Sequence, residues 1–438
     1  MHRVKRLNTA LLLGIVALSS AGCAERTPTS ADPDLLPSGP TTVELRIPWQ
    51  EFGSNLRVFG GFGSVHLIGS GLVARSYRDV LDARTLVRFS SLAKTATVTD
   101  STGTSRTDTL LSIRGGRVVA FLDSASSVSG GPVTLELGAL RQAWDVSTAT
   151  WTAAADTGGK ATLWEEPGAG PVARVTTAVW DPAKGDSVVF SLDSATTAMF
   201  RDTTALSRSV LLGMVTRGAR LAVRGLALRS TVVPSVHRDT VIDVSSTQEA
   251  LTFIYTPAPP APGSGLRVGG APAWRTTMDV AVPARIDGPP SLCAAAGCPL
   301  QLTHNRVNYA ALVLSTRRTD AGFEPADSLG LEVRVVHDPS ALPKSPLGSP
   351  LVGGFGKMLG PDLFWGAEGT AVEIPITGFV TAILKGDSVG GFPPPHSLAL
   401  LSALEPSSLA FASFFGPGTP KAPVLRLIVT VGRSVELP

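Results

Sequence analysis

Apolar side chains alternate with polar ones through much of this chain, and this alternation constrains the fold more than any other feature of the sequence. In an extended strand successive side chains point to opposite faces, so a period of two places the apolar residues on one buried face. Runs with a helical period are scarce and are confined to residues 195–201 and 379–385. We therefore predict an all-β protein. The clearest alternating sets are Val43, Leu45 and Ile47; Val133, Leu135 and Leu137; Leu331, Val333 and Val335; and Leu425, Leu427 and Val429.

The first 22 residues have the order of a bacterial export signal. Basic side chains precede an apolar run at residues 10–18, which is shorter than the about 20 residues that cross a bilayer. Small residues then lead to Cys23, and this junction resembles the lipobox of bacterial lipoproteins, although Ser20 stands where leucine is usual. We expect cleavage before Cys23, lipid on that cysteine and sorting to the outer membrane. The alternative is an ordinary secretory signal cut near Ala21.

Proline-rich stretches divide the rest of the chain. Residues 23–40 are rich in Pro, Ser, Thr and Asp, which indicates a flexible tether that spans about 20–25 Å. Cleavage of residues 1–22 leaves 416 of the 438 residues, more than the roughly 250–300 that one hydrophobic core serves. A second proline-rich stretch, residues 256–264, is the predicted linker. We expect two tandem, jelly-roll-like β-sandwich domains, at residues 41–255 and 265–438.

The two predicted domains share a pattern of residues in the same order, which indicates a duplicated β domain. Chance similarity between two strand-rich segments is the alternative. The matched segments are 84–89 with 275–280, 120–122 with 311–313, 188–201 with 372–385, 211–226 with 399–414 and 238–244 with 425–431, and Trp180 matches Trp365.

Charge and motif content exclude several classes of function. The chain that follows residue 22 carries 35 Lys and Arg against 35 Asp and Glu, whereas nucleic-acid binders normally show a basic excess. The zinc-protease motif H-E-x-x-H does not occur, and the six histidines have no metal-ligand spacing. We therefore expect no nucleic-acid partner, no metal, no cofactor and no catalytic activity. A hydrolase with an unrecognised site is the alternative.

Two cysteines bracket a short loop of small residues. Cys293 and Cys298 flank Ala-Ala-Ala-Gly, and in an exported chain such a pair is expected to form a disulfide. Closing so short a loop stabilises by about 2 kcal/mol in the chain-entropy account, so the bond would pin a loop. A metal site would need more ligands, and only His304 is near in the sequence.

The most distinctive stretch is W-D-V-S-T-A-T-W at residues 144–151, followed by a W-x-x-P-G run that begins at Trp164. Together with the closing strand pattern of residues 422–427, these motifs resemble the DNRLRE domain, a family of secreted β-sandwich modules of the disaggregatase-related type. The resemblance covers most of residues 65–244 and, more weakly, 266–431. The six letters of the family name do not occur in this sequence, and the second half has no counterpart of the first two tryptophans.

The tryptophans of this motif are the candidate ligand-binding residues. Bound sugars often stack on flat aromatic faces, so Trp144, Trp151 and Trp164 would form a glycan platform, whose affinity should change little with salt because the mature chain is neutral. The alternative is that the three rings fill the sandwich interior. Between them, Asp145 and the hydroxyl residues that follow it are expected to set a turn.

The sequence therefore predicts a non-catalytic, membrane-anchored envelope lipoprotein that binds or adheres to polysaccharide or other cell-envelope material. The family resemblance implies the glycan. A second class is a structural or assembly lipoprotein that binds a protein partner at exposed sheet edges.

Overall fold

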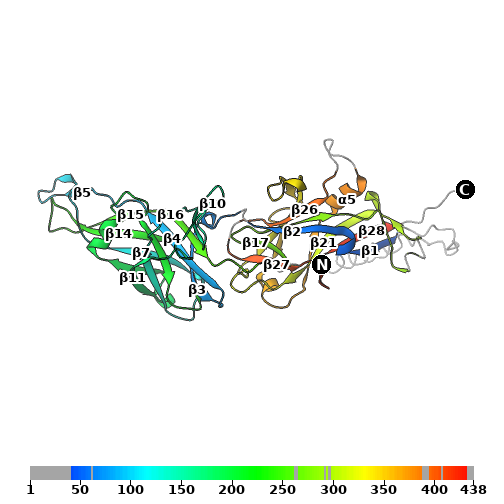
Figure 1. Ribbon diagram of the computed structural model, residues 1–438, viewed down its shortest axis with the longest axis horizontal. Coiled ribbons are helices and arrows are strands. Elements are labelled where there is room, and N and C mark those ends of the chain that lie inside the picture. The colour runs from blue at the N-terminus through cyan, green and yellow to red at the C-terminus, as the bar shows by residue number, and fades with distance from the viewer. Residues whose placement is uncertain are drawn as a thin grey trace, which may run out of the picture.

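The computed structural model describes residues 41–60, 63–260, 265–290, 293, 297–386, 394–405 and 408–431. The predicted signal peptide, Cys23 and the tether lie outside the described residues. The regular structure is almost entirely antiparallel β, so the all-β prediction is confirmed. Two sandwich-like lobes lie side by side along the long axis (Figure 1). The first lobe comprises the described residues of 63–260, and the second comprises those of 41–60 and 265–431.

The first lobe is built on one strongly curled sheet. Its strand order is β11-β8-β13-β4-β3-β14-β7-β12, with β15 on β14 and β16 on β4. Because β11 and β12, the two ends of this order, lie against each other, the sheet curls back on itself and encloses a core that includes Val87, Leu212 and Leu221. The strands are β3 (Gly71–Tyr77), β4 (Leu81–Phe89), β7 (Ser112–Val128), β8 (Val133–Ala139), β11 (Ala173–Trp180), β12 (Ser187–Leu192), β13 (Ser209–Met214), β14 (Ala219–Val233), β15 (Ile242–Ser246) and β16 (Gln248–Tyr255).

Short elements decorate the first lobe. Two hairpins extend from it, and single helical turns cap some of the loops. These elements are β5 (Ala96–Thr99) with β6 (Ser105–Asp108), β9 (Ala153–Thr157) with β10 (Lys160–Leu163), η1 (Val65–Ile68), η2 (Pro182–Lys184) and α3 (Ser194–Met199).

The second lobe has two facing sheets, with orders β1-β28-β21-β27-β17 and β2-β18-β26-β22-β23; β25 joins β21 and β24 joins β22. The strands are β1 (Thr41–Pro48), β2 (Gly53–Phe59), β17 (Gly265–Gly269), β18 (Arg275–Val280), β21 (Val307–Arg317), β22 (Leu329–Val336), β23 (Leu347–Pro350), β24 (Lys357–Leu359), β25 (Ala371–Pro375), β26 (Ser397–Ser402), β27 (Phe411–Phe415) and β28 (Val424–Val431). The remaining elements are α2 (Trp49–Phe52), the β19 (Arg285–Ile286) and β20 (Leu300–Gln301) pair, η3 (His304–Arg306), η4 (Pro339–Ala341), η5 (Pro361–Phe364) and α5 (Thr377–Lys385).

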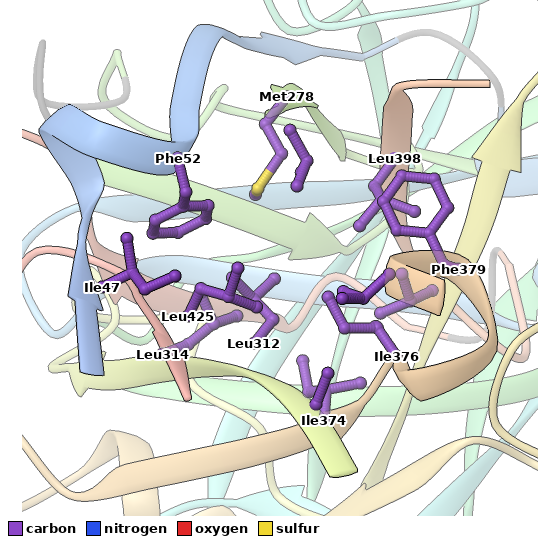
Figure 2. Packing of buried hydrophobic residues seen from close by; sticks show 14 of the residues in the cluster. Ile47, Phe52, Met278, Leu312, Leu314, Ile374, Ile376, Phe379, Leu398 and Leu425 are labelled. Atoms are coloured by element: carbon purple, nitrogen blue, oxygen red, sulfur yellow. The ribbon is translucent and has the colours of Figure 1, made fainter. Parts of the chain in front are cut away.

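The N-terminal segment β1-α2-β2 belongs to the second lobe, which corrects the predicted domain boundaries. The predicted first domain began at residue 41, but β1 pairs along its whole length with β28, and β2 pairs with β18 in the other sheet. Figure 2 shows Ile47 and Phe52 of this segment inside the second-lobe core, beside Leu425 and Leu312. Alternation identifies a strand but carries no information about which distant strand is its partner, so the sequence could not place this segment.

The chain therefore crosses between the lobes twice. The first crossing follows β2, at residues 60–64, of which 60, 63 and 64 are described, and the second is the predicted linker, residues 256–264, of which 256–260 are described. The second crossing is held by Arg267, whose side chain is 2% exposed and donates hydrogen bonds to Pro259 O at 2.6 Å and to Asp320 Oδ2 at 2.6 Å. A buried, charge-assisted contact of this kind fixes the linker to the second lobe.

The lobes share part of a strand-pairing pattern. Leu86 of β4 faces Leu211 of β13, and the residues that the sequence match makes equivalent, Thr277 and Ala399, also face each other. Likewise β12 pairs with β7 as β25 pairs with β21, and β16 pairs with β4 as β2 pairs with β18. The matched tryptophans differ, because one is a buried strand residue and the other is an exposed loop residue: Trp180 is 2% and Trp365 38% exposed.

An aromatic cluster packs the two lobes together. Tyr255 of the first lobe lies 6.2 Å, centroid to centroid, from Phe323 of the second, which lies 5.7 Å from Phe411. Beside it Arg78 donates to the Glu324 carboxylate at 2.9 Å and lies 4.4 Å from the Trp365 ring. The contact between the lobes thus combines buried apolar area, an ion pair and a cation–π contact.

Candidate ligand-binding site

The W-D-V-S-T-A-T-W segment forms the turn that its residue types predict. Oδ1 of Asp145 accepts hydrogen bonds from the backbone N–H groups and hydroxyls of Ser147 and Thr148, at 2.5–3.0 Å. These donors, the Ser147 hydroxyl above all, lower the pKa of Asp145 because they stabilise the carboxylate. The loop that follows is therefore presented in one conformation.

Two of the three predicted platform tryptophans are buried. Trp144 is 7% and Trp164 5% exposed, and both pack against Leu86, Leu211 and Ile254 in a cluster on the sheet. The indole N–H of Trp164 donates to Thr150 O at 2.8 Å. These two rings fill the lobe interior. The prediction that they form part of a glycan platform is therefore wrong for Trp144 and Trp164, and the alternative, that the rings fill the interior, holds for both.

Trp151 is the exception, because its ring is half-buried and is held in place from two sides. The guanidinium carbon of Arg84 lies 5.5 Å from the ring centroid. On another side Gly168 has φ +87°, a conformation that favours glycine, and a Cβ there would lie 3.0 Å from the ring carbons, a tight contact against the indole. The N–H of Gly168 donates to Trp151 O at 2.6 Å, and its carbonyl accepts from Arg84 at 2.6 Å.

The exposed part of this ring lines an apolar cavity of about 400 Å³ at the junction of the lobes. The cavity walls come from the 147–152 loop, the end of β16, the first residues of the linker and a turn of the second lobe. Cavities of this size with apolar walls and a few polar groups are typical ligand sites. The wall residues include Val65, Trp151, Phe253, Tyr255, Pro257 and Pro272.

A second cavity, of about 240 Å³, also has Trp151 in its wall, and it is polar. Three guanidinium groups line it, those of Arg75, Arg84 and Arg217, together with one carboxylate, Asp82. The Trp151 indole is thus a wall shared by an apolar and a cationic cavity.

One serine and histidine pair beside the apolar cavity has the composition of a nucleophile with its base. The Ser64 hydroxyl lies 2.8 Å from His66 Nδ1 and donates its single hydrogen to Ser147 O at 2.5 Å. Towards His66 this hydroxyl must therefore accept, so Nδ1 carries the proton. A general base needs the opposite polarity.

The described part of the chain contains no group of three or more His, Cys, Asp and Glu that could hold a metal ion. Within the same residues no helix is long and apolar enough to span a bilayer. Cys293 and Cys298 are joined by a disulfide at the edge of the second lobe, with a Cα–Cα distance of 4.9 Å.

No protein-family model matches the chain, and no curated protein is significantly similar to it. The resemblance to the DNRLRE domain therefore rests on the tryptophan motif and strand pattern alone and stays a prediction.

Sequence reasoning found the 147–151 part of the tryptophan motif and the linker, which line the apolar cavity, but missed the other walls of both cavities. Arg75 and Arg217 come from β3 and the turn before β14, and Pro272 comes from the other lobe. Only the proline-rich linker gave a signal, because a domain boundary is a common place for a ligand site.

Proposed function

We propose that this protein is a non-catalytic binding protein that holds polysaccharide of the cell envelope in the junction cavity. Lipid on Cys23 would anchor it to the outer membrane, and the tether would hold the lobes off the lipid surface. The single observation that carries the proposal is the half-buried Trp151 ring, fixed by Arg84 and Gly168 and exposed to a cavity of about 400 Å³.

A pre-oriented indole suits a sugar because a pyranose ring has an apolar face of C–H groups and a polar rim of hydroxyls. Stacking buries the apolar face against the aromatic ring, and little entropy is lost because the side chain is already fixed. The hydrogen-bond polarity at Ser64 and His66 supports binding without hydrolysis.

The test is binding of the Trp151→Ala protein to a panel of soluble polysaccharides, measured by affinity electrophoresis and calorimetry. Loss of one stacking contact should weaken binding about tenfold or more. Phe355→Ala is the matched control, because this ring is 66% exposed and lines neither cavity. Wild-type affinity in Trp151→Ala, or an equal loss in both variants, would contradict the proposal.

A further inference from the structure

We propose that the arginine-lined cavity behind Trp151 binds the anionic group of an acidic sugar, a carboxylate or a sulfate ester. This inference rests on the proposed function, which it deepens by naming the charge of the ligand. The cavity shares the Trp151 wall with the apolar cavity, so one sugar chain can contact both.

The three guanidinium groups of this cavity have few acceptors within the protein. Arg84 donates to Gly168 O, and Arg75 makes one long hydrogen bond to Met214 O at 3.4 Å. Arg217 has neither a hydrogen bond nor an ion pair with any described residue. Each guanidinium carries five N–H donors. Most of these donors therefore have no acceptor in the protein and are available to a ligand or to water in the cavity.

The single carboxylate in the wall does not pair with these cations. Oδ1 of Asp82 accepts from the Ser76 N–H at 2.7 Å, and none of the three arginines forms an ion pair with a described carboxylate. Among the groups that line this cavity three are cationic and one is anionic, although the mature chain as a whole is neutral; Glu136 and Glu166 are near enough to act on Arg84 but do not line the cavity. Net charge therefore says little about this site, and the salt-insensitive binding expected from it does not apply here.

Of the three guanidinium groups only that of Arg84 is partly buried, because Arg75 and Arg217 are exposed. Desolvation lowers the pKa of Arg84 and the nearby charge of Arg75 lowers it further, while Glu136, Asp82 and Glu166 act in the opposite direction. An anion placed among the three guanidinium groups would offset the desolvation of Arg84 and its repulsion by Arg75. Planar, forked guanidinium groups match carboxylate and sulfate oxygens by paired hydrogen bonds.

Two matched pairs of polymers test the charge: polygalacturonate against its methyl ester, and dextran sulfate against dextran. Arg75→Gln and Arg217→Gln remove exposed charges with little or no structural role, and Arg285→Gln, an exposed arginine of the second lobe, is the control. The wild type should bind at least one acidic polymer about tenfold tighter than its neutral partner, and that preference should shrink with added salt. Both cavity variants should lose the preference, and Arg285→Gln should keep it.

Each outcome decides a separate point. The acidic polymer that is preferred identifies the carboxylate or the sulfate. Equal binding of acidic and neutral partners, lost in Trp151→Ala, would overturn this inference and leave the proposed function standing. An acidic preference that survives in both cavity variants would overturn the assignment to this cavity. Absence of binding to all four polymers would overturn the proposed function and this inference together.

Discussion

At the scale of single residues, side chains of one type in one motif have different roles. The motif predicted a turn at Asp145, and its hydrogen bonds form within a few residues, so local chemistry was sufficient. It could not separate Trp151 from Trp144 and Trp164, because burial of an indole depends on strands far away in the chain. Leu211 and Ile254, which cover the two buried rings, come from β13 and β16.

The buried tryptophans should matter for stability and only indirectly for binding. Trp164→Ala removes a ring that is 5% exposed and a hydrogen bond to Thr150 O, so we expect the free energy of unfolding to fall by about 3–5 kcal/mol. Phe355→Ala, at an exposed ring, should change it by less than about 0.5 kcal/mol. Denaturant titration of both variants measures this difference. Wild-type stability in Trp164→Ala would show that the ring is not part of the core.

At the scale of elements, alternation predicted strands correctly where one face is buried. Leu425, Leu427 and Val429 lie in β28 and are at most 1% exposed. Alternation did not predict which strands pair with each other, because β1 lies at the opposite end of the described chain from its partner β28. The sequence predicts one join between the domains, the linker at residues 256–264, whereas the N-terminal segment β1-α2-β2 supplies a second crossing between the lobes.

Cleavage of the linker should therefore not release the lobes. A specific protease site introduced within residues 256–264 would cut one crossing, but the N-terminal segment β1-α2-β2 would stay covalently attached to the first lobe and hydrogen-bonded in the second. We expect the two fragments to co-elute on size-exclusion chromatography in native buffer and to separate in denaturant. Separate elution of the fragments in native buffer would contradict the strand pairing described here.

At the scale of the whole molecule, the candidate site exists only because the lobes are fixed to one another. The aromatic cluster around Tyr255 and Phe323, the Arg78–Glu324 ion pair and the two crossings hold Pro272 opposite Trp151. None of these contacts is local in sequence, so a cavity built from them could not be read from periodicity or motif. The sequence predicted two domains and one wall of the site, and the other walls depend on contacts between segments that are distant in the chain.

The central claim is that a sugar occupies the junction cavity against Trp151, and the seven tryptophan indole N–H signals report on it most directly. Nitrogen-15 spectra of the mature protein, assigned with single Trp→Phe variants, would be recorded while an acidic oligosaccharide, tetragalacturonate, is added. We expect the Trp151 signal to move most and those of buried Trp144 and Trp180 to stay nearly in place. An unchanged Trp151 signal with movement at exposed Trp365, at saturating oligosaccharide, would contradict binding in this cavity.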